Sequence, residues 1–169
     1  LQPLSPYGIH KLQAEQIVKE FYDFYQIQTC SLRIFSAYGN GLRKQLFWDM
    51  YQKFLNADSI ALYGTGKESR DFIHVDDIVR AFHLVLDNGK FNGEATNIAN
   101  GEEFTIEYVS EIFRRNFEGQ KTITFNNQVK QGDPLNWRAD ISLLKSLGYQ
   151  QTVSLEAGIQ SYIHWVNSL

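Results

Sequence analysis

Two side chains near the start of the chain have the types and the spacing of a proton-transfer pair. Tyr7 and Lys11 are four residues apart, so on a helix they share one face, with Cβ atoms about 5–6 Å apart. A phenol with an ordinary pKa near 10 is a poor base at neutral pH, but a cation within about 4–6 Å lowers such a pKa by roughly 1–3 units. Tyr7 could then accept a hydroxyl proton while Lys11 held a ribose. Tyr-x-x-x-Lys also arises by chance on solvated helix faces, so the pair alone is a weak signal.

A candidate phosphate contact follows a glycine turn in the middle of the chain. Arg70 comes just after the turn at residues 64–66, at the start of a predicted strand. There a guanidinium can reach a ligand and bind phosphate oxygens through two parallel hydrogen bonds. The alternative is a surface arginine that pairs with Glu68 or Asp71.

Two neighbouring acids and a histidine have ordinary structural explanations. Asp76 and Asp77 could form an acid/base pair, but the helix predicted directly after them makes a helix N-cap the better interpretation. His74 precedes that cap and is interpreted as a core or hydrogen-bonded strand histidine. We therefore leave all three outside the predicted site.

The spacing of hydrophobic residues predicts alternating helices and strands that would position these side chains. Ser5 fits the cap of the first helix, and Pro6 fits its first turn. Helices are expected over residues 6–25, 43–55, 76–88, from 105 onward, over 141–147 and at the end, around Leu155, Ile159, Ile163 and Val166. Strands are expected over residues 27–35, 59–63, 70–74, 94–99 and 122–125. The helix after Asp77 is expected to turn four side chains inward: Ile78, Phe82, Val85 and Leu86. This alternation predicts an α/β fold.

The composition excludes several classes of protein. The 169 residues are 43% hydrophobic and 21% charged, which supplies a packed core and excludes a largely disordered chain. A net charge of -3 gives too little positive field to hold nucleic acid or an anionic membrane. Cys30 is the single cysteine, and no Cys and His cluster has the spacing of a metal site, so neither an internal disulfide nor a metal is expected. No apolar run approaches the roughly 18 residues of a membrane span, and a cytoplasmic protein is expected.

Several motifs in a fixed order carry a resemblance that covers essentially the whole chain. They are Ser-Pro-Tyr-Gly-Ile-His-Lys at 5–11, Ser-Leu-Arg-Ile-Phe-Ser-Ala-Tyr-Gly at 31–39, and Gly-Thr-Gly-Lys-Glu-Ser-Arg-Asp-Phe-Ile-His-Val-Asp-Asp at 64–77. The strand at 95–99, the Gly132-Asp133 loop and the segment 139–149 agree with them. Together they resemble the extended short-chain dehydrogenase/reductase family, in particular the nucleotide-sugar epimerases and dehydratases of the UDP-glucose 4-epimerase type.

This resemblance implies a fold and a division of the chain. The fold would be the C-terminal part of a Rossmann-type extended short-chain dehydrogenase/reductase plus its smaller α/β substrate-binding domain, with the N-terminal dinucleotide-binding half absent. Residues 1–38 would end the Rossmann domain and carry the catalytic helix and the strand after it. Residues 39–169 would be mainly the substrate-binding domain, with elements near 75–100 that complete the Rossmann sheet.

The family's first glycine-rich turn, which binds the NAD pyrophosphate, has no counterpart in this sequence. Gly39-Asn40-Gly41 is interpreted as a loop, because Lys44 stands where a third glycine belongs. The family's catalytic Ser or Thr, upstream of the Tyr, is also missing. We therefore expect NAD to be bound mainly by the missing half, and the chain alone to be inert and not to bind NAD.

The resemblance also assigns roles to individual residues. Tyr7 and Lys11 would be catalytic and would also bind the cofactor. Phe35 would line the nicotinamide side with Tyr38, although aromatic residues at strand ends are more often core. Arg70 matches the arginine that contacts the nucleotide diphosphate in the epimerases.

Three further positions match the family's substrate site, and at two of them the residue differs from the usual one. Ser36 replaces the usual Asn, and a hydroxyl can still donate one hydrogen bond. Lys130 stands where many members have the arginine of Arg-Pro-Gly-Asp, so the charge is kept and the bidentate fork is lost. Trp137 lies four residues after Asp133, where 4-epimerases place the side chain that walls the pocket around the sugar's C2 substituent. The alternatives are a solvated Lys130 and a Trp137 packed in the core.

The resemblance implies an NAD-dependent nucleotide-sugar epimerase that acts through a transient 4-keto sugar, in surface polysaccharide or sugar-nucleotide biosynthesis. Its partner would be a nucleotide-diphosphate sugar, and the full-length protein would be a homodimer. A 4,6-dehydratase or a reductase of the same family stays open. A non-catalytic substrate-binding or dimerisation module is the third alternative, and the sequence argues against it because strands of a parallel sheet need neighbours to be buried.

Overall fold

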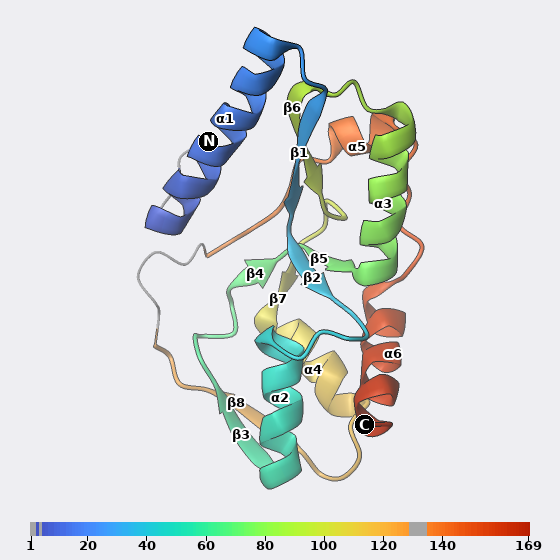
Figure 1. Cartoon of the computed structure of the whole chain (residues 1–169). Coiled ribbons are helices and arrows are strands. Elements are labelled where there is room, and N and C mark those ends of the chain that lie inside the picture. The colour runs from blue at the N-terminus through green and yellow to red at the C-terminus, as the bar shows by residue number, and fades with distance from the viewer. Residues whose placement is uncertain (1–2, 4, 129–134) are drawn as a thin grey trace.

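The computed structural model describes Pro3, residues 5–128 and residues 135–169. Its upper part in Figure 1 is built on strand β1 (Thr29–Ile34), which runs parallel to strand β6 (Asn92–Ile98). Helix α1 (Pro6–Tyr25) lies on one side of this pair and helix α3 (Val75–Asn88) on the other (Figure 1). The predicted α/β class is confirmed by this arrangement.

Helix α1 begins and ends as its sequence predicts. The Ser5 hydroxyl accepts a hydrogen bond from the Gly8 amide at 3.2 Å, and Pro6 occupies the first turn. The helix ends at Gln26, which takes the left-handed conformation with φ 55°. None of the side chains of α1 is buried. Its main contacts with other described elements are with β1 and β6.

The lower part of Figure 1 has its own, largely aromatic core. Its helices are α2 (Gln45–Asn56), α4 (Ile106–Arg115) and α6 (Leu155–Asn167). They lie on one side of the parallel strands β3 (Ser59–Leu62) and β8 (Thr122–Phe125) (Figure 1). The ring of Phe47 lies 5.8 Å from the rings of Phe113 and Tyr162. A second apolar cluster joins α3 and β6 to the short helix α5 (Ser142–Ser146). Helices α1, α2, α3 and α5 and the last strand confirm the predicted ranges to within about two residues. Helix α4 begins one residue after its predicted start, and α6 carries the four predicted apolar residues.

Short strands join the two parts, and the sequence did not resolve them. Strand β2 (Ser36–Tyr38) is separate from β1 and pairs in parallel with β5 (Phe72–His74). Strand β4 (Ser69–Arg70) is separate from β5 and pairs antiparallel with β7 (Phe104–Thr105). The predicted single strand over 70–74 is therefore wrong, because Asp71 breaks it by turning its carboxylate onto three backbone amides.

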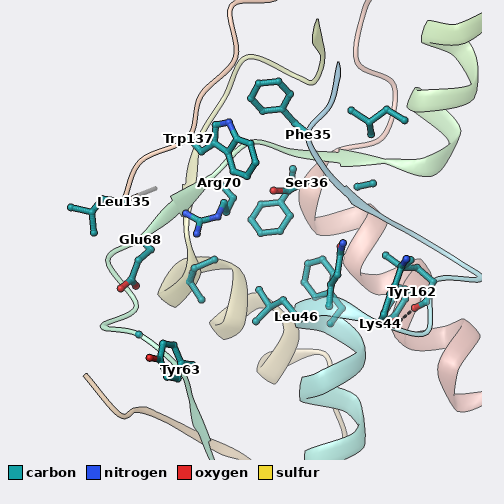
Figure 2. A pocket seen from close by; sticks show the side chains of 18 of the residues that line it. Phe35, Ser36, Lys44, Leu46, Tyr63, Glu68, Arg70, Leu135, Trp137 and Tyr162 are labelled. Carbon is teal, nitrogen blue, oxygen red and sulfur yellow. Dashed lines mark hydrogen bonds between the residues drawn. The ribbon is translucent and has the colours of Figure 1, made fainter. Parts of the chain in front are cut away.

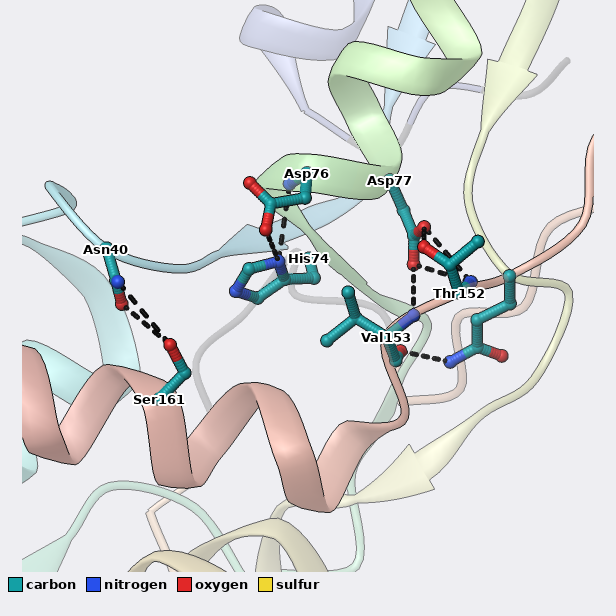
Figure 3. A network of polar contacts seen from close by, with 8 residues as sticks. Asn40, His74, Asp76, Asp77, Thr152, Val153 and Ser161 are labelled. Atoms are coloured by element: carbon teal, nitrogen blue, oxygen red, sulfur yellow. Dashed lines mark hydrogen bonds and ion pairs between the residues drawn. The ribbon is translucent and has the colours of Figure 1, made fainter.

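The predicted cap of α3 is also wrong. The N-cap is His74, whose Nδ1 accepts a hydrogen bond from the Asp76 amide at 3.3 Å (Figure 3). Asp77 is fully buried and accepts hydrogen bonds from the Thr152 hydroxyl and from the amides of Thr152 and Val153. The interpretation of His74 as a buried, hydrogen-bonded histidine is confirmed.

The bonds made by Asp77 rotate α3 away from its expected orientation. Because they draw Asp77 inward, the row that faces the core is Asp77, Ala81 and Val85. Val85 is buried as expected, whereas Phe82 and Leu86 are exposed. The hydrophobic spacing alone placed these two side chains on the wrong face.

His74 should make the stability of the intact protein depend on pH. Burial lowers the pKa of His74, and the nearby carboxylates of Asp76 and Asp77 only partly oppose this. The unfolded chain therefore binds more protons than the native state near pH 6, and the stabilisation that is complete above pH 6.5 is lost as the pH falls through the native pKa. We expect the urea midpoint to fall between pH 7.5 and 5.5 in the parent protein. The fall should be smaller in His74→Asn, which keeps a cap but cannot titrate, and an equal fall in both proteins would contradict this prediction.

Candidate active site

A cavity of about 520 Å³ lies where the two parts of the molecule meet (Figure 2). Five of the predicted site residues line it, from four separate segments: Tyr7, Phe35, Ser36, Arg70 and Trp137. A cavity of this size is in the range of small-molecule sites. The structure thus brings together residues up to 130 positions apart in the chain.

Tyr7 and Lys11 occupy the first turns of α1 at the edge of this cavity. The Lys11 ammonium nitrogen lies 5.6 Å from the centroid of the Tyr7 ring. Tyr7 is 72% exposed, so its phenol is open to a ligand. Lys11 does not line the cavity itself.

Trp137 stands between two other predicted site residues. Its indole ring lies 5.4 Å from the Phe35 ring, and the Arg70 guanidinium carbon lies 5.9 Å from the indole centroid (Figure 2). Trp137 is 42% exposed, so the alternative of a tryptophan packed in the core is wrong. A guanidinium over an indole face is attracted by the ring quadrupole, and the stack favours one orientation of Arg70.

The acids on either side of Arg70 have other hydrogen bonds. Burial tends to raise the pKa of Glu68, but hydrogen bonds from the amide and hydroxyl of Thr65 hold it below its usual range. Asp71 is 1% exposed, and its carboxylate accepts from the amides of Asn100, Gly101 and Ala139 at 2.9, 2.9 and 3.1 Å. Burial raises the pKa of Asp71 although these amides oppose it. The Arg70 guanidinium donates to the Ser69 carbonyl at 2.8 Å.

Of the two remaining predicted site residues, Ser36 lies in the described part of the chain. Ser36 begins β2, and its amide donates to the Asp71 carbonyl at 3.1 Å, which holds its backbone at the cavity wall. Lys130 and the Gly132-Asp133 loop lie outside the described residues.

The cavity also contains residues that the sequence reasoning missed. Lys44 and Gln45, at the start of α2, and Tyr63, just after β3, line it. Gln45 has φ 66°, a left-handed conformation that non-glycine residues seldom adopt. An aromatic residue directly before the glycine turn was the available sequence signal for Tyr63. Nothing in the local pattern distinguished Lys44 from an ordinary surface lysine.

Among residues 5–128 and 135–169, no three His, Cys, Asp or Glu side chains are grouped to hold a metal ion. Within the same ranges, no helix has the length and the hydropathy to cross a membrane.

Comparison with known proteins gives concordant matches. The family model described as NAD dependent epimerase/dehydratase family matches residues 1–99. The chain is 32% identical to a Bacillus subtilis protein named as an uncharacterized UDP-glucose epimerase, YtcB, over 100% of the chain and 54% of the relative. It thus spans about half the length of the curated relatives it matches.

Solved structures match with similar coverage. The UDP-glucuronic acid 4-epimerase from Bacillus cereus, in complex with UDP-glucuronic acid and NAD, is 29% identical with a TM-score of 0.89, over 99% of this chain and 54% of that one. A UDP-N-acetylglucosamine 4-epimerase from Methanobrevibacter ruminantium is 26% identical with a TM-score of 0.87, over 99% and 55%. A family model that matches more than half of the chain, and a relative that matches all of it, lead to one conclusion: the chain belongs to the NAD-dependent epimerase/dehydratase family.

Proposed function

We propose that the intact protein is an NAD-dependent nucleotide-sugar epimerase that acts through a transient 4-keto sugar. The observation that carries this proposal is the position of Tyr7, with the Lys11 ammonium beside its ring, on the same cavity that Arg70 and Trp137 line. A proton acceptor, a phosphate-binding cation and an aromatic wall are what oxidation of a sugar hydroxyl on a nucleotide carrier requires. The product would supply sugar nucleotides for surface polysaccharides, in the cytoplasm.

The chain's own residues fit an NAD site that is shared with a further domain. Lys11 presents an exposed ammonium for the ribose hydroxyls, and the Phe35 ring offers an apolar surface at the end of β1. In the described chain β1 pairs only with β6, which leaves its other edge open to a strand of a Rossmann sheet. This supports the division in which residues 1–38 and the elements near 75–100 complete that domain and the rest of 39–169 holds the substrate.

The proposed roles of the residues follow from their atoms. When bound, NAD would accept the hydride from the sugar carbon and return it. Tyr7 Oη would take the proton of the sugar 4-hydroxyl and give it back, with the Lys11 charge beside it. The guanidinium of Arg70 would hold the diphosphate, and Trp137 would wall the sugar.

The direct test is product formation by the intact protein with NAD and a UDP-sugar. Because relatives are named as epimerases of UDP-glucose and of UDP-glucuronic acid, both sugars should be offered and the products identified by NMR. A 4-epimer supports the proposal. A 4-keto-6-deoxy sugar would instead make the protein a dehydratase, and a sugar reduced at the expense of NADH would make it a reductase. Binding of the UDP-sugar without turnover would favour the non-catalytic module.

Replacing Arg70 by alanine should raise KM for the UDP-sugar by roughly 10- to 100-fold, with a smaller effect on kcat. A charge-assisted contact to phosphate contributes about 1.5–3 kcal/mol and is present in the ground state as well as in the transition state. Steady-state kinetics of the intact protein measure this. Arg115→Ala, on the exposed end of α4 and paired with Glu111, is the matched control and should leave KM unchanged. Loss of stability at unchanged KM would assign Arg70 a structural role.

Replacing Trp137 by serine should relax the choice of sugar. An indole that walls the sugar's C2 substituent would leave no room for a 2-acetamido group, so we expect the parent protein to prefer 2-hydroxy sugars such as UDP-glucose over UDP-N-acetylglucosamine. Steric exclusion can exceed the discrimination of about 1–3 kcal/mol that a missing methylene gives. The ratio of kcat/KM for the two sugars should therefore fall by at least about tenfold in Trp137→Ser and stay near the parent's in Trp137→Phe. An unmoved ratio, or equal turnover of both sugars by the parent, would remove Trp137 as the gate.

We also propose that the intact protein is a homodimer paired through α1. The exposed side chains of that helix include Ile9, Phe21 and Phe24, which form an apolar flank. Two such helices packed about a two-fold axis would cover this surface. A monomeric mass in sedimentation would contradict this proposal.

A further inference from the structure

A third charged residue continues the row of Tyr7 and Lys11 along α1. Glu15 lies four residues after Lys11, a spacing at which a lysine and an acid on a helix attract each other. The same helix shows this pairing further along, where Lys19 Nζ bonds to Asp23 Oδ2 at 2.8 Å with the same order and spacing. On spacing alone, Glu15 could therefore pair with Lys11 or with Lys19, each four residues away.

Arg33 of β1 prevents that outcome by occupying the whole carboxylate of Glu15. Arg33 Nε donates to Glu15 Oε1 at 2.7 Å, and Nη2 donates to Oε2 at 2.5 Å. The two side chains are only 29% and 21% exposed, respectively. The hydrogen bonds from Arg33 hold the pKa of Glu15 below its usual value, and Glu15 raises the pKa of Arg33. The carboxylate is therefore ionised and fully engaged, while Lys11 lies over the Tyr7 ring.

We propose that Arg33 and Glu15 are positioning residues for the reaction: Arg33 holds Glu15 away from Lys11, so that the Lys11 charge stays beside Tyr7. The inference rests on the proposed function, in which Tyr7 and Lys11 carry the proton transfer.

The bidentate geometry explains why Glu15 pairs with Arg33 rather than with Lys11. A guanidinium binds both carboxylate oxygens at once. Water also screens the half-buried Arg33–Glu15 pair less than it would screen a pair between Glu15 and the exposed Lys11. Two lysines lie four residues from Glu15 on the same helix, Lys11 and Lys19. Lys19 is already paired with Asp23. Removal of Arg33 alone would therefore leave Lys11 as the lysine available to Glu15.

Arg33→Gln in the intact protein tests this inference with two readouts. In a crystal structure of the variant, Lys11 Nζ should lie within about 4 Å of the Glu15 carboxylate, the ion-pair distance. The acidic limb of the kcat pH profile should move to higher pH by about one unit, which lowers kcat about tenfold on that limb. The double variant Glu15→Gln/Arg33→Gln should bring the limb back to its parental position, because no acid is left to capture Lys11. Arg33→Lys, which keeps the charge, should stay close to the parent.

The controls separate positioning from a merely structural role. Asp23→Asn removes the other ion pair of the helix and should leave the profile unchanged. If Arg33→Gln does not fold, Glu15→Gln alone still tests the inference, and a shift of its limb to higher pH would overturn it. A double variant shifted as far as Arg33→Gln, or an unmoved Lys11 in the crystal, would also overturn it. No turnover by the parent would refute the proposed function, while the crystal structure would still decide the exchange of ion-pair partners.

Discussion

Tyr7→Phe is expected to lower kcat of the intact protein by at least about 100-fold, the usual loss when a general base is removed. Phenylalanine keeps the ring beneath the Lys11 ammonium and removes only the oxygen that would accept the sugar proton. KM should change little, because Arg70 and Trp137, which are proposed to hold the substrate, are unchanged in this variant. Only the chemical step loses its acceptor.

Single-turnover kinetics with UDP-glucose and NAD measure this effect apart from product release. The matched control is Tyr25→Phe, since Tyr25 is an equally exposed tyrosine at the far end of α1. Near-normal turnover in Tyr7→Phe would reduce Tyr7 to an ordinary helix residue. Equal losses in both variants would point to a general effect on α1 instead.

Asp71→Ala should lower the free energy of unfolding by at least about 3 kcal/mol, since each buried amide left without a partner costs about 1–3 kcal/mol. Three backbone amides lose their acceptor at once: those of Asn100, Gly101 and Ala139. The same carboxylate joins the strand of Arg70 to the segment of Trp137, so the variant should also loosen the stack of these two side chains.

Urea unfolding at neutral pH measures the loss, and the fluorescence of Trp137 reports on the stack. Asp140→Ala is the control, because its exposed carboxylate bonds only to Ser142 within the described chain and should cost less than about 1 kcal/mol. A similar small loss in Asp71→Ala would mean that water replaces the carboxylate at these amides.

The sequence predicted best what depends on local repetition. The helix at 6–25 has a cap, a proline in its first turn and apolar residues at helical spacing, and all three signals indicate the same helix. The strand at 122–125 is likewise a short run of β-favouring residues between polar loops. The shortest strands have no such repetition, and β2 and β4 exist because distant strands pair with them.

Hydrogen bonds between residues far apart in the chain explain why the cap of α3 was predicted wrongly. Asp77 looked like a cap because the sequence around it is typical of one, but its partners are 75 and 76 residues away. The residues of the candidate site were predicted from the ordered family motifs and not from local repetition. No sequence pattern could reveal that Trp137 stacks on Arg70. The roles assigned to Tyr7, Ser36 and Lys130 stay predictions until the variants are measured.

The shallow seating of α1 has a consequence for dynamics. With no buried side chain, this helix offers little apolar area against its release, so it should open by local unfolding well below the free energy of global unfolding. Its amides would then exchange with solvent faster than those of α6, which has six buried residues. Any partner or ligand that binds only the closed helix would slow this exchange by mass action. The proposed proton-transfer pair therefore lies on a helix whose local stability should rise when a ligand or a partner binds it.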